Sequence, residues 1–289
     1  MKLKLVLQQL FPDLNPARLP GGFDQVGDIA VIGITPEVVA RERQIGAIIL
    51  ASSPHIRVVV KRNGPYEGVH RILPLTVIAG EERFTTVHRE NGVLFHLDLA
   101  QVYFSSRSAH ERARIAAQVQ PGENVAVLGS GVGPYPLIIA RHSQALEIVG
   151  IEINPDAHQY AQKNLAANRS ISNVVCIAGD AARELPALHR SFDRILIAQP
   201  HGGAALLPHA LAALRPGGCL HLYDMQPKNR YNGTIAKVKA ACSRMHRLIR
   251  HLDTTLCGHC GPTRYRICLD AVIDATEPCT RTHVYNATG

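Results

Sequence analysis

The hydrophobic pattern of the chain changes about one third of the way along it. From residue 22 to residue 104, short runs rich in Val, Ile and Thr are separated by Gly, Pro and Asn, which predicts strands. These runs are DIAVIGI, HIRVVVKR, LPLTVIAG, RFTTVHRE and VLFHLDLAQVYF. Between them, PEVVARERQIGAIILAS has apolar residues at helical spacing. Residues 22–105 are therefore predicted to form a small α+β domain.

From about residue 106, apolar strands alternate with helical segments. The predicted strands are VAVLG, EIVGIE, NVVCIAG, DRILIA and GCLHLYDM, and RLIRHL and RYRICLDAVI predict a closing antiparallel pair. This alternation is typical of an α/β domain with a mostly parallel, Rossmann-like sheet that binds ligands beyond the carboxyl ends of its strands. The predicted organisation is an extension at 1–21, the small domain, this domain at 106–275, and a tail at 276–289.

Composition and charge narrow the class of protein. The chain has 289 residues, of which 46% are hydrophobic and 19% charged, as in ordinary globular proteins. No apolar run approaches the roughly 20 residues that span a bilayer, and the N-terminus lacks the long apolar region of a signal peptide. We therefore expect a cytoplasmic protein without membrane association. The net charge of +8 favours a polyanionic partner, with ordinary solvated surface charge as the alternative.

The cysteines give a weak chemical signal. Cys257 and Cys260 form a CGHC sequence, with Cys279 further along the chain. Structural zinc sites need four ligands, and no second pair follows at a suitable spacing. We interpret CGHC as a loop before a strand and predict no metal site, with metal binding or a disulfide as the alternatives.

A glycine-rich turn follows the first strand of the second domain. In LGSGVGPYP, Gly129, Gly131 and Gly133 allow a tight strand-to-helix turn and a close approach of the backbone to a ligand. The next strand ends in GIEINP, which places Glu152 21 residues after Gly131. A carboxylate there can accept hydrogen bonds from both hydroxyls of a ribose, although this spacing does not by itself distinguish between cofactors.

Two details favour S-adenosylmethionine over a dinucleotide. The turn reads GSGVG followed by Pro134, which departs from the dinucleotide pattern GxGxxG. The third strand ends at Asp180, in the position where class I methyltransferases contact the adenine amino group. The alternatives are that Asp180 caps the next helix and that Glu152 is a solvated acid before a helix. The glycine turn, Glu152 and Asp180 each follow or end a predicted strand, and all three fit S-adenosylmethionine, which favours the cofactor over these alternatives.

Several longer motifs resemble one enzyme family. FDQVGDIAVIGI, VIAGEERFTTVHRENG, VYFSSRSAHERARIA, GSGVGPY and EINPDA are similar to segments of the archaeal and eukaryotic tRNA (guanine-37-N1)-methyltransferases, which have the class I methyltransferase fold. The resemblance covers most of residues 22–273 and implies a short form without an extra N-terminal domain. It further implies S-adenosylmethionine as methyl donor, the tRNA anticodon loop as partner, and a monomer. The alternatives are a sister reaction of the wyosine pathway, transferring a methyl or an aminocarboxypropyl group, and a degenerate RNA- or partner-binding protein.

The resemblance assigns roles to four residues. Glu111 matches the proposed general base, Arg71 matches an arginine that steadies guanine O6, and Tyr103 and Arg107 match further active-site positions. These types suit the reaction, because guanine N1 must lose a proton and negative charge then spreads to O6. The spacing also allows plainer interpretations, in which Glu111 completes a capping box with Ser108 or pairs with Arg107.

The chain departs from the family pattern at two strand ends. Val127 occupies a position that is usually acidic, and Ala198 stands where the family has an asparagine at the end of the fourth strand, followed here by Gln199 and Pro200. We expect Ala198 and Pro200 to line the cofactor site. Either Gln199 or the nearby His201 is expected to take over the role of the asparagine.

Overall fold

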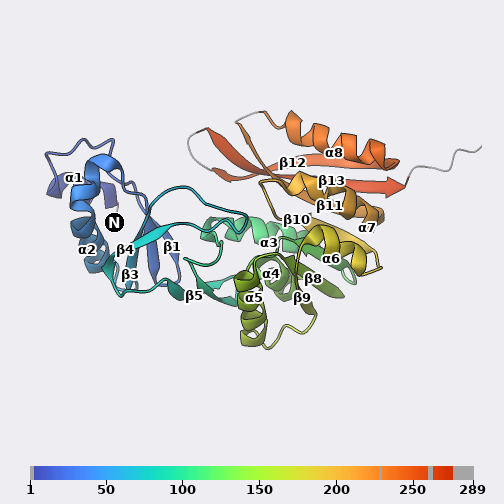
Figure 1. Ribbon diagram of the computed structural model, residues 1–289, viewed down its shortest axis with the longest axis horizontal. Helices are drawn as coiled ribbons and strands as arrows, with labels where there is room; N and C mark the ends of the chain where they lie inside the picture. The colour runs from blue at the N-terminus through green and yellow to red at the C-terminus, as the bar shows by residue number, and fades with distance from the viewer. Residues whose placement is uncertain (1–2, 228–229, 260–262, 276–289) are drawn as a thin grey trace, which may run out of the picture.

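In the computed structural model, the chain forms two lobes, a smaller N-terminal one and a larger one that contains the rest of the chain (Figure 1). The structure describes residues 3–227, 230–259 and 263–275. The predicted tail at 276–289 lies outside the described residues, as does Cys260 of the CGHC sequence. The other three residues of that sequence, 257–259, end strand β12 (Arg247–His259), so the prediction of a loop is wrong for them.

The small lobe is a four-stranded sheet covered by helices. Its strands lie in the order β1-β2-β3-β4, with β2 and β3 parallel and the other pairs antiparallel. The parallel pair needs a crossover, which the predicted helical segment supplies as a 3-10 turn and a helix. The elements are β1 (Asp24–Val26), β2 (Ile29–Ile32), η1 (Pro36–Arg41), α2 (Glu42–Ser52), β3 (Val58–Arg62) and β4 (Leu75–Gly80).

The N-terminal segment belongs to this lobe rather than forming a separate extension. Helix α1 (Leu3–Leu10) buries Leu3 and Leu7, which join a core with Ile45 and Ile49 of α2. The sequence predicts no helix here, because two helical turns with few core positions give only a weak periodic pattern.

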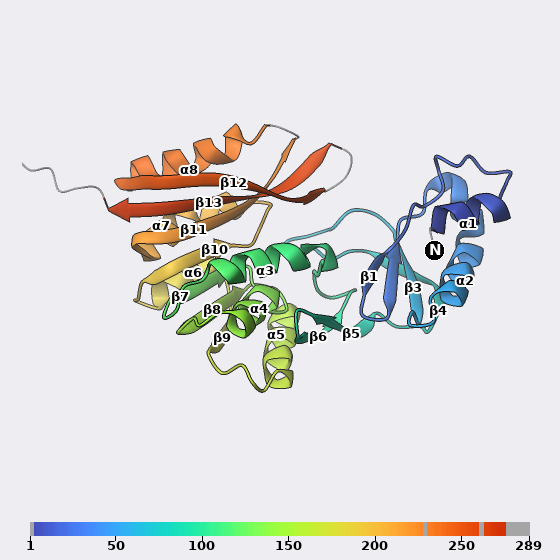
Figure 2. The ribbon, with the colours of Figure 1, turned by 180° about the vertical axis from the view of Figure 1, so that it is seen from behind.

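The hairpin β5 (Thr85–Glu90) and β6 (Val93–Asp98) lies between the two lobes (Figures 1 and 2). Asn164 of α5 (Pro155–Ala167) and Asn168, which caps the carboxyl end of that helix, bind its backbone. Asn164 and Asn168 accept hydrogen bonds from the backbone N–H groups of His96 and Leu94, at 2.7 and 3.0 Å, and donate to the carbonyls of the same residues. The hairpin is thus fixed to the large lobe. The predicted domain boundary at residue 105 stays a prediction.

The large lobe has a seven-stranded sheet in the order β12-β13-β11-β10-β7-β8-β9. The five strands β11, β10, β7, β8 and β9 run parallel, while β13 and β12 are antiparallel and close one edge, as the sequence predicted. The strands are β7 (Asn124–Leu128), β8 (Glu147–Glu152), β9 (Val174–Ala178), β10 (Phe192–Ile197), β11 (Leu214–Pro227), β12 (Arg247–His259) and β13 (Arg264–Ala275).

Helices cover both faces of this sheet, which confirms the predicted α/β class (Figures 1 and 2). One face carries α3, α4 and α5, and the other α6, α7 and α8, so the sheet separates two apolar cores. The additional elements are η2 (Ser106–Ser108), α3 (Ala109–Gln118), α4 (Pro134–His142), α6 (Ala181–Ala187), η3 (Gly203–Leu206), α7 (Leu207–Ala213) and α8 (Asn232–Arg244).

Candidate active site

The glycine turn lies at the carboxyl end of β7. Gly129, Gly131 and Gly133 have φ angles of 75°, 58° and 88°, a left-handed region that other residues rarely adopt. The backbone N–H groups of Gly129 and Ser130 donate to the carbonyl of Ile151, at 2.9 and 3.0 Å, which ties the turn to β8. Each glycine is therefore required by the backbone conformation, as the sequence analysis expected.

Glu152 ends β8 beside this turn and is buried. Its Oε2 accepts a hydrogen bond from Gly131 N at 2.7 Å, and its Oε1 accepts one from Asn154 N at 2.8 Å. A carboxylate oxygen has two lone pairs, so each oxygen can still accept a hydrogen bond from a ligand hydroxyl. This geometry fits a ribose diol and differs from the alternative of a solvated acid.

Asp180 has the geometry of a helix cap. Its Oδ1 accepts a hydrogen bond from Ala182 N at 2.9 Å at the start of α6, and its side chain is exposed. An adenine contact at this position stays a prediction.

Two adjoining chambers open at the carboxyl ends of β7, β8 and β10. Tyr103, Gly129, Gly131, Ala198 and Pro200 line both of them. We call the first the Glu152 chamber, whose further lining comes from Val69, His70, Arg71, Glu152, Ile153, Asn154, Ala157 and Gln199. We call the second the Tyr223 chamber, whose further lining comes from Phe104, Ser105, Ser108, Arg112, Ser130, Pro134, Tyr135, Tyr223 and Arg266.

Arg71 reaches the Glu152 chamber from the small lobe. It lies in a turn between β3 and β4 with a φ of 55°. Its guanidinium carbon is 5.5 Å from the ring centroid of Tyr66 and 5.7 Å from that of Tyr103, and the two rings are 5.0 Å apart. Contacts of this kind orient a cation without neutralising it. Arg71 and Tyr103 are therefore brought together at the cofactor turn, whereas an ordinary strand position would have left Arg71 facing solvent.

Arg107 lies apart from both chambers. Its side chain is 64% exposed, and its Nε donates a hydrogen bond to Asp24 Oδ1 of β1, which also pairs with Arg62. This contact joins η2 to the small lobe. Arg107 does not pair with Glu111, so that alternative is wrong.

Glu111 is buried in α3 and lines neither chamber. Arg114 binds both of its carboxylate oxygens, Nε to Oε2 and Nη2 to Oε1, each at 2.7 Å. The hydroxyl of Tyr223 donates to Oε1, also at 2.7 Å. Ser108 precedes α3 without a side-chain cap bond. The capping-box alternative is therefore wrong as well.

The residues that follow β10 differ in whether they face the two chambers. Ala198 and Pro200 line both chambers, and the Gln199 side chain lies across Gly129, because a Cβ added to Gly129 would be 2.5 Å from Gln199 Cγ and 3.2 Å from Nε2. His201 is exposed and lines neither chamber. Of the two residues considered for the asparagine role, only Gln199 faces the cofactor turn.

A buried chain of charged groups extends from Glu111 across the sheet. Arg114 also donates to Asp270 Oδ2 at 2.6 Å, and Asp270 Oδ1 is 2.6 Å from His221 Nδ1. His221 Nε2 is 2.6 Å from Arg194, which bonds Glu123. Since arginine can only donate, His221 Nε2 accepts and Nδ1 carries the proton, so the imidazole is neutral. Burial lowers the pKa of His221, in agreement with this state.

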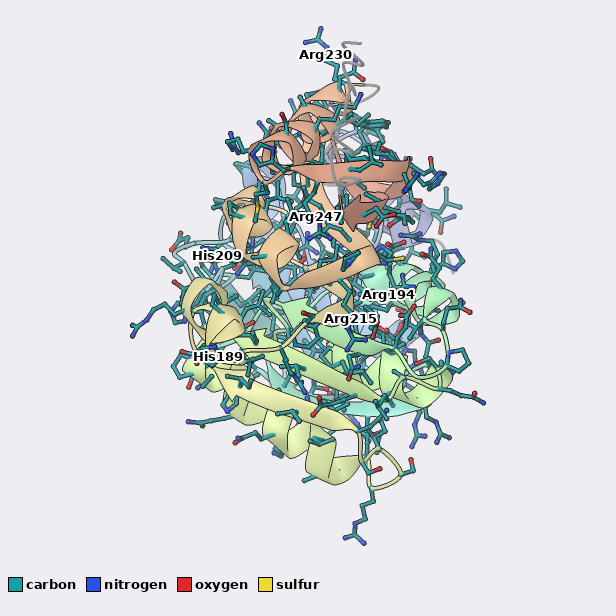
Figure 3. All side chains as sticks on the ribbon, turned by 90° about the vertical axis from the view of Figure 1, so that its right-hand side faces the viewer. His189, Arg194, His209, Arg215, Arg230 and Arg247 are labelled. Atoms are coloured by element: carbon teal, nitrogen blue, oxygen red, sulfur yellow. The ribbon has the colours of Figure 1, made fainter. Side chains whose placement is uncertain are left out.

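Sequence reasoning missed this network because its members come from α3, β10, β11 and β13. Arg194 lies at the amino end of the sheet, the end that faces the viewer in Figure 3. The sequence signal was polar residues within otherwise apolar strands, such as His221 in GCLHLYDM and Asp270 in RYRICLDAVI. Buried polar groups of this kind need partners, but the sequence does not identify them.

One group in the described part of the chain has metal-ligand chemistry, namely His221, Cys268 and Asp270. These groups already satisfy one another, with Cys268 Sγ 3.1 Å from Asp270 Oδ1, and two guanidiniums flank them. That cationic surrounding opposes a metal ion. Separately, no helix among the described residues has the length and apolarity needed to cross a membrane.

Comparisons with known proteins agree with this geometry. Residues 86–249 match the family model of the TRM5/TYW2 methyltransferase domain, and residues 3–83 match that of the TYW2 N-terminal domain. The tRNA (guanine(37)-N(1))-methyltransferase Trm5b of Pyrococcus abyssi is 32% identical over 253 residues, which cover 87% of this chain and 74% of that protein.

Two further proteins are similar over most of the chain. The tRNA 4-demethylwyosine(37)-methyltransferase Taw21 of Saccharolobus solfataricus is 29% identical over 251 residues, covering 85% of this chain and 91% of that protein. The solved complex of aTrm5 and tRNALeu superposes with a TM-score of 0.82 at 25% identity, covering 95% of this chain and 78% of that one. The chain therefore belongs to the TRM5/TYW2 methyltransferase family and is an S-adenosylmethionine-dependent enzyme.

Proposed function

We propose that this enzyme transfers a methyl group from S-adenosylmethionine to N1 of guanine 37 in tRNA. The observation that carries the proposal is the position of Arg71, a cation held against Tyr103 at the chamber that also contains Glu152. A fixed cation beside the methyl donor suits an acceptor that becomes anionic, as guanine does at O6 when N1 loses its proton. Curated relatives with the same activity support the assignment.

The residues around the glycine turn fit the cofactor. Glu152 would accept hydrogen bonds from the ribose hydroxyls, and the turn leaves room for close approach, because a Cβ added to Gly131 would meet no atom nearer than 4.0 Å. When bound, S-adenosylmethionine supplies an electrophilic methyl group. Ala198 and Pro200 would line the space between this methyl group and the acceptor base.

The acceptor base would enter from the small lobe. Tyr103 offers an aromatic face for stacking the splayed base, and Arg71 would donate hydrogen bonds to O6. We assign Glu111 to accept the N1 proton. Arg107, which is exposed where η2 meets the small lobe, would contact the phosphate backbone of the anticodon loop. The proposal is for a monomer that acts in the cytoplasm.

A second candidate is methylation of a wyosine intermediate. The match of residues 3–83 to the TYW2 N-terminal domain and the similarity to Taw21 over most of both chains favour it. The replacement of the family asparagine by Ala198 is consistent with a different acceptor.

The two candidates separate in one experiment. Purified protein and labelled S-adenosylmethionine are incubated with tRNA transcripts carrying G37 or A37, and with tRNA carrying 4-demethylwyosine. Nucleosides are then identified by mass spectrometry. We expect 1-methylguanosine from the G37 transcript alone. Turnover only on the wyosine intermediate would favour the second candidate, and aminocarboxypropylated nucleoside would refute methyl transfer.

A further inference from the structure

The predicted base, Glu111, does not reach either chamber directly. It is 4% exposed, and Arg114 holds both of its oxygens. Among the described residues, one group both lines a chamber and bonds Glu111, namely Tyr223 of β11. Within the described part of the chain, that hydroxyl therefore connects the chamber to Glu111.

The hydroxyl of Tyr223 is oriented for this purpose. It has a single proton, and that proton is donated to Glu111 Oε1 at 2.7 Å, because an ionised carboxylate can only accept. Toward the chamber the oxygen therefore presents lone pairs. It can accept a hydrogen bond from a donor such as the N1–H of guanine.

From this geometry we infer that Tyr223 is a catalytic residue that relays the N1 proton of guanine to Glu111. The inference rests on the proposed function. As the N1–H bond breaks, its proton goes to Tyr223 Oη, and the proton of that hydroxyl goes to Glu111 Oε1. The freed electron pair of N1 forms the bond to the methyl carbon. The pair of the S–C bond stays on sulfur, which becomes a neutral thioether.

The surrounding charges can accommodate the arriving proton. The buried network holds three carboxylates, those of Glu111, Asp270 and Glu123, against two guanidiniums, those of Arg114 and Arg194, and its imidazole is neutral. Within this set the carboxylates outnumber the guanidiniums by one, and Arg266, which also faces the pair, balances that charge. When Glu111 takes up the proton, Arg114 keeps its pair with Asp270.

Tyr223 stays neutral before and after the step. Burial raises its pKa well above the usual value, so a tyrosinate is not sustained and the two proton transfers are coupled. The titratable and charged groups that face the pair are Arg112 and Arg114 of α3, Tyr135 of α4, Cys257 of β12, and Arg266, Cys268 and Asp270 of β13.

None of these neighbours titrates between pH 6 and 9. Burial raises the pKa of Cys257, Cys268 and Tyr135, and the arginines keep their charge. Asp270 is buried, which alone would raise its pKa, but hydrogen bonds from His221 and Arg114 hold that pKa below its usual range. A pH profile in this interval therefore reports on the relay.

The test is Tyr223→Phe, which keeps the buried ring and removes only the hydroxyl. Single-turnover methyl transfer to G37 tRNA is measured from pH 6 to 9, together with S-adenosylmethionine affinity by calorimetry. We expect a loss of about 10²-fold at pH 6.5 with unchanged cofactor affinity. We also expect the loss to shrink about tenfold per pH unit, because hydroxide then removes the proton.

Tyr265→Phe is the matched control, because Tyr265 is a buried tyrosine of the neighbouring strand β13 that lines neither chamber. It should cost less than about fivefold, independent of pH. Adding Glu111→Gln to Tyr223→Phe should cause little further loss, because both act on one proton path. Parallel pH profiles, or a loss below threefold, would overturn the relay. Absence of 1-methylguanosine with the wild-type enzyme would instead refute the proposed function.

Discussion

Replacement of Glu152 should separate cofactor binding from the rest of the site. Its two oxygens already bind Gly131 N and Asn154 N, and each keeps a lone pair for a ribose hydroxyl. A hydrogen bond to a charged acceptor contributes about 1.5–3 kcal/mol. Two such bonds contribute about 3–6 kcal/mol, which corresponds to about 10²–10⁴-fold in affinity.

The assay is calorimetric titration of S-adenosylmethionine into the wild-type protein and variants. Glu152→Ala should lose about 10²–10⁴-fold in affinity, and Glu152→Gln about 10–100-fold, because the amide keeps one acceptor oxygen. Stability should also fall, since two backbone N–H groups lose their acceptor, at about 1–3 kcal/mol each where water cannot replace it.

Glu147→Ala is the matched control, because Glu147 begins the same strand at the opposite end and pairs with Arg190. It should leave the affinity unchanged. If Glu152→Ala bound the cofactor within about threefold of the wild type while retaining a cooperative melting transition, the ribose assignment would be refuted.

Three further outcomes are expected. Gly129→Ala should weaken cofactor binding about tenfold, since its Cβ would lie 2.5 Å from Gln199 Cγ, and adding Gln199→Ala should restore part of the affinity in the same titration. Glu90→Ala should destabilise the protein by about 3–5 kcal/mol in urea, because it leaves the buried guanidinium of Arg112 unpaired. Burial alone would raise the pKa of Glu90, but its hydrogen bonds with Arg112 lower it below the ordinary value of 4.5. Glu90 therefore contributes its full share to the free energy of unfolding above pH 4.5, and this share is lost as the pH falls further. The urea midpoints of the wild type and the variant should converge in acid. Arg71→Lys should slow methyl transfer about 10²-fold with unchanged cofactor affinity, and an unaltered rate would remove Arg71 from the O6 role.

The sequence predicted the features that depend on neighbours along the chain. The turn at Gly129–Gly133 and the acid at Glu152 lie within one strand-turn-helix unit and the strand after it, so their spacing specifies their geometry. The environment of Glu111 could not be predicted in this way. Its partner Tyr223 is 112 residues away. Arg114 is only three residues away, but the spacing alone does not decide among Ser108, Arg107 and Arg114 as the partner of Glu111.

Helix α1 could not be predicted even though its residues are adjacent in the sequence. Its sequence LKLVLQQL is too short to give a convincing period, and its place in the fold depends on the complementary surface of α2. Likewise, the position of Arg71 depends on how the two lobes are joined. A strand pattern does not encode that relationship.

The bonds from Asn164 and Asn168 determine where this protein can be recombined with its relatives. The β5–β6 hairpin follows the small lobe in sequence, yet its backbone is bound to α5. A chimaera joined near residue 83 would keep the hairpin with its own asparagines. A junction at residue 105 would place a hairpin from another protein against Asn164 and Asn168. The N–H and C=O groups at the positions of Leu94 and His96 would then have to meet these asparagines with a hairpin of different sequence. Exchanges of the small lobe within the family should therefore be disrupted less at the first junction, which separates Thr86 and His88 from Asp28 and Gly27, than at the second.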